Sequence, residues 1–195
     1  MSRRGILLVL SGPSGTGKGT VGRRLREMEP EMRWSVSWAT RPARPGEIDG
    51  VDYHFVEREE FERARDDGGF LEWFEVFGDL KGTPAGPVRE HLAAGRDVLL
   101  EVDVQGALAI RDSCPEALLV FLRPPSREVQ RARIVGRGQD SPEAVERRLA
   151  EASAEEAQAG RFDAVVVNDD LETAVSDVAA ILRARREGDH DGPAD

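Results

Sequence analysis

Residues 11–20 read SGPSGTGKGT, and this stretch decides the fold of the 195-residue chain. Gly12, Gly17 and Lys18 occupy the first fixed positions of the pattern G-x-x-x-x-G-K-[ST], a glycine-rich loop (P-loop) that cradles phosphates. The pattern then requires Ser or Thr, but Gly19 stands there and a hydroxyl follows one position later, at Thr20. An apolar run, GILLVL at 5–10, precedes the loop, and apolar residues at helical spacing follow it. The predicted order of strand, loop and helix is the context in which such a loop works.

The chemistry of this loop comes mainly from its backbone. Successive N–H groups form a nest for an anion, and the N-terminus of the following helix adds its dipole. Gly15 and Gly17 let the chain curl around phosphates, and Lys18 can reach the outer phosphates of a triphosphate. Without a hydroxyl at position 19, Mg²⁺ would depend more on phosphate oxygens and water. We therefore expect transfer between two nucleotides rather than a GTPase-type switch. The alternative is a glycine-rich turn with a purely structural role.

The rest of the chain alternates apolar runs with helical patterns. Further strands are predicted at 97–104 (DVLLEVDV), 117–122 (ALLVFL) and 163–168 (DAVVVN), and a last helix is marked by Ala174, Val178 and Ile181. Continuous apolar strands separated by helices predict an α/β fold with a central parallel sheet. Residues 35–90 break this rhythm and are expected to form an inserted lobe with its own short strands. The Arg-rich segment 126–150 is expected to be a mobile helical arm, in which Ser141 caps a helix that starts with Pro142.

Composition narrows the classes of partner. The net charge of −10 argues against a general nucleic-acid binder, which needs a basic face. The single cysteine, Cys114, cannot form an intrachain disulfide, which agrees with a reducing compartment. The early apolar run is too short for a signal peptide or a membrane span, so we expect a cytoplasmic protein with a mature N-terminus. The three His residues and the cysteine are scattered, without metal-ligand spacing.

A second anion site is predicted beyond the loop. Arg41 and Arg44 lie three apart across a proline in SVSWATRPARPGEIDGVDYHF, residues 35–55, and Tyr53 can add a hydroxyl. The prolines stiffen the segment, so two guanidinium groups could hold a phosphate at low entropic cost. The alternative is a solvated Arg–Pro loop. Only two of the 27 basic residues are lysines, Lys18 and Lys81, which suggests that a compact ammonium group is needed at both places.

Three acidic residues are candidates for the remaining chemistry. Glu72 lies within the apolar stretch GFLEWFEV, residues 69–76, and a buried carboxylate could accept the two donors of a guanine edge. Glu101 and Asp103 lie at the end of the strand predicted at 97–104, and alternation places them on the same face of that strand. Asp103 is placed like an acid that orients metal-bound water. The alternatives are an exposed Glu72 and a merely structural carboxylate at the strand end. The Arg-rich arm could close over the phosphates, or it could be a solvated helix.

These segments, in this order, resemble guanylate kinase, a P-loop nucleoside monophosphate kinase. The resemblance runs from Gly5 to about Ile181, and it implies Mg²⁺-dependent transfer from ATP to GMP or dGMP, with no nucleic acid, membrane or obligate protein partner. The segments that carry it are SGPSGTGKGT, residues 35–55, FLEW at 70–73, GTP at 82–84, EVDVQGA at 101–107, PPS at 124–126, RGQDS at 137–141 and VVVNDDL at 165–171.

The resemblance also implies roles for individual residues. The ATP site would comprise Gly12, Pro13, Ser14, Gly15, Thr16, Gly17, Lys18, Gly19, Thr20, Arg133, Arg137 and, near adenine, Asn168. The GMP site would comprise Ser37, Arg41, Arg44, Tyr53, Glu72, Lys81, Thr83, Glu101 and Arg148. Catalysis would depend on Lys18, Arg41, Arg137, Arg148 and Asp103, the last of these beside metal-bound water. The implied single domain spans 1–185, with a core (1–34, 88–125 and 149–185), a GMP-binding lobe (35–87), a lid (126–148) and a disordered acidic tail (186–195).

The sequence departs from the family pattern at several positions. Trp38 and Ala39 stand in a stretch that is usually rich in Ser and Thr, and Gln139 replaces a Thr. Lys81 stands where the family generally has a Tyr that donates to the GMP phosphate. We expect Lys81 to contact that phosphate, and the alternative is that it points to solvent.

Two rival functions remain from sequence alone. Related modules in scaffold proteins bind peptides and have lost catalysis, but they commonly lack the loop lysine or the arginines that are present here. A related kinase could act on another nucleoside monophosphate or on a phosphorylated sugar.

Overall fold

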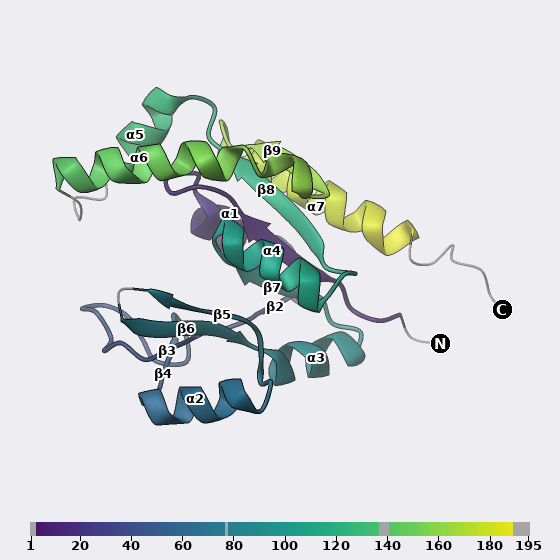
Figure 1. Ribbon diagram of the computed structural model, residues 1–195. Coiled ribbons are helices and arrows are strands. Elements are labelled where there is room, and N and C mark those ends of the chain that lie inside the picture. Colours follow the sequence, from purple (N-terminus) through teal and green to yellow (C-terminus); the bar gives the residue numbers. More distant parts are fainter. Residues whose placement is uncertain (1–2, 77, 137–140, 189–195) are drawn as a thin grey trace.

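A computed structural model of the chain describes residues 3–76, 78–136 and 141–188. The described chain is an α/β protein built on two sheets. Figure 1 shows the larger sheet at the centre. The smaller sheet lies below the larger one, with helix α2 beneath it, and helices α5 and α6 lie above the larger sheet in this view. No helix among the described residues is long and apolar enough to cross a membrane.

The larger sheet confirms the predicted parallel core. Its order is β2-β7-β1-β8-β9, and every pairing between neighbours is parallel. Its strands are β1 (Leu7–Ser11), β2 (Arg33–Trp34), β7 (Val98–Glu101), β8 (Leu118–Arg123) and β9 (Ala164–Val167). The carboxyl ends of β1, β7 and β8 therefore meet at one edge of the sheet, which is where ligands bind in folds of this class.

Helices cover both faces of this sheet because β1 is apolar on both sides. Leu8 and Leu10 face the cluster formed with α1 (Lys18–Met28) and α7 (Leu171–Gly188). Leu7 and Val9 face the opposite cluster, to which α3 (Ala85–Ala93) and α4 (Val104–Ser113) contribute. A strand buried on both faces reads as the continuous apolar run seen in the sequence.

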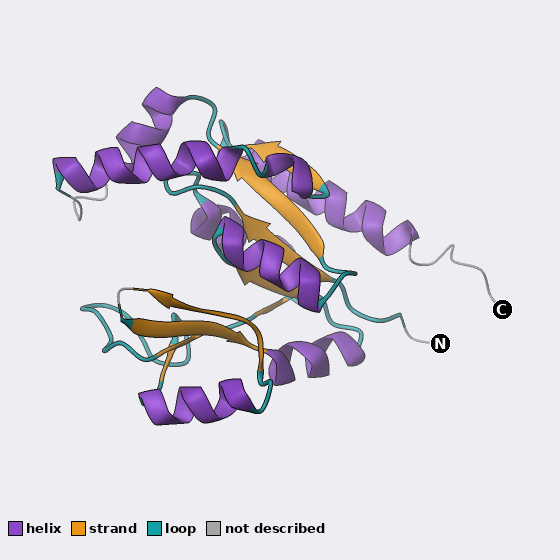
Figure 2. Ribbon diagram, in the orientation of Figure 1, coloured by secondary structure: helices purple, strands orange, loops and turns teal. Residues whose placement is uncertain are grey.

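The smaller sheet forms the predicted inserted lobe. Its order is β4-β3-β6-β5, with β3 (Trp38–Ala39), β4 (His54–Phe55), β5 (Phe70–Val76) and β6 (Asp79–Pro84). Antiparallel pairing of β5 with β6 places Glu72 opposite Thr83. One face of this sheet carries α2 (Arg58–Asp66), whose Phe61 stacks on Phe70 with ring centroids 4.3 Å apart. Figure 2 shows the strands of the two sheets as separate orange groups.

The Arg-rich segment folds as two helices, α5 (Arg127–Val135) and α6 (Pro142–Glu156). As predicted, Ser141 caps α6 by accepting a hydrogen bond from the Ala144 N–H at 3.3 Å, and Pro142 takes the first turn. Ser126 caps α5 in the same way through the Val129 N–H. Arg137 and Gln139, which the sequence analysis singled out, lie outside the described residues.

Two boundaries differ from expectation. The strand predicted at 97–104 ends at Glu101, and Asp103 is the N-cap of α4, so the two acids do not continue one strand face. Helix α7 runs to Gly188, so the expected tail cannot begin at 186. The reason is Arg186, which pairs with Glu29 at 2.8 Å and with Asp97 at 2.7 Å and so holds the end of the helix on the core. A short 3₁₀ turn, Ala159–Arg161, connects α6 to β9.

Candidate functional site: two anion pockets and a buried carboxylate

The loop at 12–17 has the backbone of an anion nest. Gly12, Gly15 and Gly17 have φ of 139°, 81° and 87°, a region in which side chains are strained. Gly17 is the N-cap of α1, so the helix N-terminus opens at the loop. The Lys18 ammonium folds back and donates to the carbonyls of Gly12 at 2.6 Å and Pro13 at 3.1 Å. Glycine backbone, a helix N-terminus and a cation thus meet at this loop, and these are the features of a phosphate site.

Two buried amides brace this loop from opposite sides. The Asn168 side chain, next to β9, donates to the Thr16 carbonyl at 2.7 Å. The Gln130 side chain, on α5, donates to the Ser14 carbonyl at 2.8 Å and is fully buried. A Cβ on Gly17 would lie 2.5 Å from the Asn168 amide nitrogen, so the glycine is needed for this contact. Asn168, expected near adenine, is therefore placed on the loop backbone.

Gly19 has a neighbour that explains its lack of a side chain. A Cβ at this position would lie 3.1 Å from one carboxylate oxygen of Glu101. Glu101 ends β7, the strand beside β1, and so projects toward the start of α1. A Ser or Thr at position 19 would therefore require the end of the Glu101 side chain to move by a few tenths of an ångström. Thr20, one residue on, is exposed.

Asp103 also lies at this edge of the sheet. One of its carboxylate oxygens accepts the Gly106 N–H at 2.7 Å and caps α4. The cap holds the side chain in place and leaves the second carboxylate oxygen for another contact. The residue itself is exposed. Its negative charge contributes to raising the pKa of both Glu72 and Glu155, so it lies near both carboxyls.

The face of the small sheet opposite α2 carries the polar residues. Glu72 is only 7% exposed and accepts the hydroxyl hydrogen of fully buried Thr83 at 2.5 Å. Burial raises the pKa of the Glu72 carboxyl, while the Thr83 hydrogen bond and the charge of Lys81 partly offset this. Ser37 lines the same pocket as Lys81 and Glu101, a cavity of about 280 Å³. Glu72 does not itself line this cavity, but Lys81 does, and Lys81 lies two residues from Thr83 on β6, close enough for its charge to act on the Glu72 carboxyl.

A second cavity, of about 270 Å³, adjoins this pocket. Tyr53 and Lys81 line both cavities, and Arg41 and Arg44 line only the second. The Arg41 guanidinium carbon lies 5.0 Å from the centre of the Tyr53 ring, and the Lys81 nitrogen lies 5.1 Å from it. The two anion-binding residues predicted from the Arg–Pro segment thus meet the chain's second lysine around one tyrosine.

Arg41 already has an acidic partner, Glu47. Two hydrogen bonds of 2.6 and 2.7 Å join the guanidinium and the carboxylate, and both side chains are about four-fifths buried. The Arg41 hydrogen bonds are the main reason why the pKa of Glu47 falls to about 2. Sequence reasoning missed this carboxylate, because a loop rich in Gly and Pro gives no periodicity from which a contact six residues apart can be inferred.

The two arm helices bring further charge toward the phosphate loop. Arg133, on α5, has a buried Nη1 that finds no hydrogen-bond partner within the described residues. Arg148 is half-buried on α6. Glu155, also on α6, has a pKa raised by burial and partly offset by the nearby Lys18, so this end of α6 lies by the loop. Gln130 and Glu155 were also missed, since nothing in a helical pattern identifies the residues that contact another segment.

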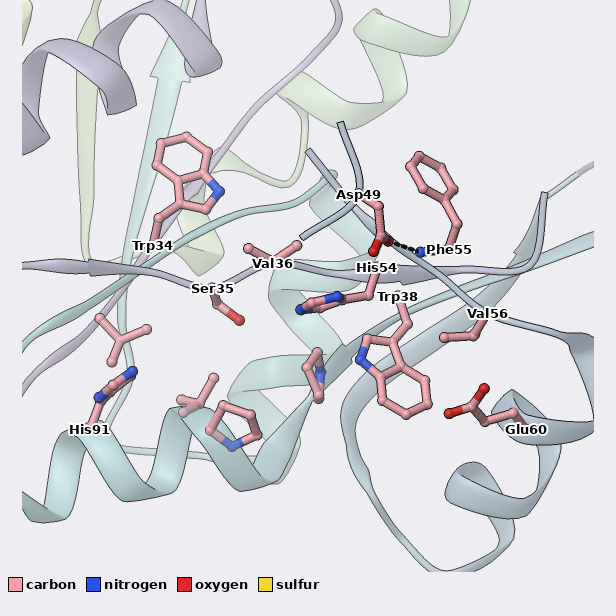
Figure 3. Close-up of a pocket in the computed structure, with 14 residues that line it drawn as sticks. Trp34, Ser35, Val36, Trp38, Asp49, His54, Phe55, Val56, Glu60 and His91 are labelled. Carbon is pink, nitrogen blue, oxygen red and sulfur yellow. Dashed lines mark hydrogen bonds between the residues drawn. The ribbon is translucent and has the colours of Figure 1, made fainter. Parts of the chain in front are cut away.

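A separate pocket of about 600 Å³ lies on the other face of β3. Figure 3 shows Trp38 and His54 pointing into it, with Ser35 and His91 at one end and Glu60 at the other. This pocket shares Trp34 and Ser35 with the cavity of about 280 Å³ that Ser37 lines. Its lining is mainly apolar, and the only hydrogen bond drawn there joins Asp49 to the backbone of Phe55 at 2.9 Å.

Comparison with known proteins shows which proteins this chain is similar to. The family model described as "Guanylate kinase" matches residues 4–185. A guanylate kinase from Symbiobacterium thermophilum is 51% identical over 183 residues, which cover 94% of this chain and 87% of that protein. One from a Mycobacterium species is 54% identical over 180 residues, which cover 91% of each chain. The crystal structure of guanylate kinase from Anaplasma phagocytophilum superposes with a TM-score of 0.76 at 36% identity, covering 94% of this chain and 87% of that one.

Proposed function

Because the chain belongs to the guanylate kinase family, we propose that the sites described above carry out the family reaction, in which ATP and GMP give ADP and GDP. One observation carries the assignment of residues to substrates. The buried Glu72–Thr83 pair lies on the sheet face beside the cavity of Arg41, Tyr53 and Lys81. A base-reading carboxylate beside a cationic phosphate pocket fits a guanine nucleotide monophosphate.

The donor site is the loop at 12–20. Its N–H groups and the N-terminus of α1 bind the outer phosphates of ATP, and Lys18 moves from the carbonyls of Gly12 and Pro13 onto the transferred group. Gln130 and Asn168 hold the loop carbonyls, which keeps the N–H groups turned inward. Asn168 can also lie near adenine, as the family resemblance implies.

The acceptor site is the polar face of the lobe. The free edge of Glu72 accepts the guanine N1–H and exocyclic amine, with Thr83, Ser37 and Glu101 around the base. Arg41, Arg44, Tyr53 and Lys81 hold the phosphate of GMP. Phosphoryl transfer needs little covalent chemistry from the protein, so the rate depends on holding the two phosphates in line and neutralising their charge. Arg133, Arg137 and Arg148 supply that charge from the lid.

We propose Mg²⁺ as the metal that accompanies ATP. The described residues contain no group of three or more His, Cys, Asp or Glu that could bind a metal alone. This suits Mg²⁺, which binds through substrate phosphates and water with one or two carboxylates. The second oxygen of Asp103, with Glu101 nearby, would hold a metal-bound water there. Mg²⁺ held there would supply positive charge that offsets the charge of the ATP phosphates.

The boundaries of the core, the GMP-binding lobe and the lid also belong to the proposal. We assign the core to 1–34, 88–125 and 149–185, the GMP-binding lobe to 35–87 and the lid to 126–148. Closure of the lobe and the lid would exclude water from the reacting phosphates. The proposal also includes dGMP as an acceptor, a cytoplasmic reaction, and no requirement for a nucleic acid, a membrane or a protein partner.

A coupled assay of ADP release with GMP, dGMP, AMP, UMP and CMP tests the proposed function. GMP and dGMP should support turnover, and the other three should not. Activity on AMP without activity on GMP would contradict the acceptor assignment. No ADP release with any acceptor, together with tight GMP binding, would instead favour a binding module of the scaffold type.

A further inference from the structure

We propose that Glu47 is a positioning residue, which holds the Arg41 guanidinium so that one defined edge faces the phosphate of GMP. The inference rests on the proposed acceptor site. Glu47 lies within residues 35–55 but has no role assigned to it above, and it carries the same charge as the phosphate that it would help to bind. The edge that Arg41 offers to a phosphate is set by which of its N–H groups are already used.

An arginine side chain has five N–H donors in a planar fork. In Arg41, Nη1 donates to Glu47 at 2.6 Å and to the Pro42 carbonyl at 3.0 Å, so both of its hydrogens are used. Nη2 gives one hydrogen to Glu47 at 2.7 Å. Two donors remain, the Nε–H and the second Nη2 hydrogen, and they lie side by side on one edge of the fork. Such an edge binds a phosphate through two parallel hydrogen bonds.

Glu47 also fixes the loop that carries the second arginine. The carboxylate oxygen that binds Nη1 accepts the Arg44 N–H at 2.8 Å. In return, the Glu47 N–H donates to the Arg44 carbonyl at 3.0 Å. One carboxylate therefore sets both the orientation of Arg41 and the backbone position of Arg44.

The surroundings keep the fork in this orientation. The Arg41 guanidinium lies over the Tyr53 ring at 5.0 Å and the Phe55 ring at 5.5 Å, so its plane is restrained from one side. The hydrogen bonds to Glu47 raise the pKa of the Arg41 guanidinium, which therefore stays charged. The cavity in front holds Lys81 and Arg44 as further donors.

Orientation and simple electrostatics predict opposite results for Glu47→Gln. If Glu47 only adds negative charge, or blocks the site as a stand-in for the phosphate, its neutralisation should strengthen GMP binding. If Glu47 positions the fork, the variant loses the ionic pair and one of its two acceptors, and the fork can turn away. We expect the KM for GMP to rise about tenfold, the scale of one charge-assisted hydrogen bond. The KM for ATP should change less than about twofold.

Guanosine separates positioning from a loss of structure. It carries the base without the phosphate, so its inhibition constant against GMP should be the same in Glu47→Gln and in the unmodified protein. Glu62→Gln is the matched control, because Glu62 pairs with Arg58 at 3.0 Å in the same lobe, on α2, away from both cavities. Its kinetic constants should not change. In an Arg41→Ala background, Glu47→Gln should raise the KM for GMP by less than it does in the unmodified protein, because only its hold on the Arg44 backbone is left to lose.

A fall in the KM for GMP, or no change, in a folded Glu47→Gln variant would overturn the proposal. Equal weakening of GMP and guanosine would also overturn it, because the role of Glu47 would then be structural. These results differ from failure of the proposed function, in which the unmodified protein would not phosphorylate GMP at all.

Discussion

Glu72 is one residue on which both the choice of base and the pH dependence of base binding are expected to depend. Burial raises the pKa of its carboxyl, and the Thr83 hydroxyl at 2.5 Å leaves one edge for the base. Only the ionised carboxylate can accept both guanine donors. Because the pKa is raised, the protonated form appears at a higher pH than it would for an exposed glutamate.

The first prediction concerns this carboxyl. As the pH is lowered from 7.5 to 5, the inhibition constant of guanosine should rise, because guanosine has no phosphate to titrate and reports on the base site alone. Glu72→Gln should weaken the binding of guanosine at pH 7.5 and remove most of the pH dependence of its inhibition constant. A flat guanosine profile in the unmodified protein would argue that Glu72 does not read the base.

The second prediction concerns Lys81, which lies between the two cavities. Lys81→Ala should raise the KM for GMP about tenfold or more, as expected for loss of a hydrogen bond to a charged group, and should leave the KM for ATP nearly unchanged. Lys81→Arg keeps the charge and should restore part of the loss. An unchanged KM for GMP in Lys81→Ala would mean that the side chain points to solvent and does not bind the phosphate.

At the scale of elements, α5 is attached to the phosphate loop through one buried side chain. The side-chain N–H of Gln130 donates to the Ser14 carbonyl and so joins the helix to the loop. The side-chain oxygen of Gln130 accepts a hydrogen bond from Arg127 at 3.3 Å. A Cβ at Gly15 would lie 2.9 Å from Ile134, so the helix packs directly on the loop. Movement of the lid would therefore be felt by the loop that binds ATP.

The third prediction follows from this contact. Gln130→Ala leaves the Ser14 carbonyl without its buried donor and should lower the free energy of unfolding by about 1–3 kcal/mol. It should also raise the KM for ATP more than the KM for GMP. Gln158→Ala is the control, since within the described part of the chain Gln158 bonds only to nearby Arg161 at 3.3 Å and to backbone groups. Equal shifts in both KM values would argue against a specific link to the loop.

The sequence predicted elements better than contacts between them. The parallel core followed from continuous apolar runs, and the α6 cap followed from Ser141 and Pro142. The pairing of Glu72 with Thr83 depends on the register of β5 and β6, which a bulge between Phe70 and Glu72 shifts. The partners of Gln130 and Glu47 depend on how segments pack, and no local pattern encodes that. The early end of β7 was missed because Val102 and Val104 continue the apolar alternation beyond the strand.

At the scale of the molecule, Asp97 ties the ends of the chain together. It is nearly buried and accepts hydrogen bonds from Arg3 at 2.8 Å, the Ile6 N–H at 2.7 Å and Arg186 at 2.8 Å. Burial alone would raise the pKa of its carboxyl, but these hydrogen bonds outweigh burial and hold the pKa below its usual value. The N-terminal segment, the start of β7 and the end of α7 therefore share one carboxylate.

The fourth prediction uses this cluster. Asp97→Asn removes the buried charged partner of Arg3 and leaves Arg186 with Glu29 alone, and it should cost about 3 kcal/mol of unfolding free energy at pH 7. The pKa of the Asp97 carboxyl is lower in the folded than in the unfolded protein, so the ionised carboxylate stabilises the fold. This stabilisation is complete above the unfolded pKa of about 4 and is lost as the pH falls through the folded pKa. Below about pH 4 the stabilities of variant and unmodified protein should therefore converge.

Asp66→Asn is the matched control for this comparison. Asp66 pairs with Arg65 at 2.8 Å, but its side chain is 67% exposed. Denaturant unfolding should show a change within about 0.5 kcal/mol for this variant. Equal losses in the two variants at pH 7 would mean that the Asp97 cluster has no special role.

The central claim is that a buried carboxylate selects the guanine base, and the comparison of GMP with IMP tests it most directly. IMP keeps the phosphate and the N1–H but lacks the exocyclic amine, so it offers Glu72 one donor where GMP offers two. The measurement is kcat/KM for both nucleotides with saturating ATP. The account predicts that IMP is poorer by about tenfold to a hundredfold, the cost of one hydrogen bond to a charged group. Equal kcat/KM values for IMP and GMP would contradict it.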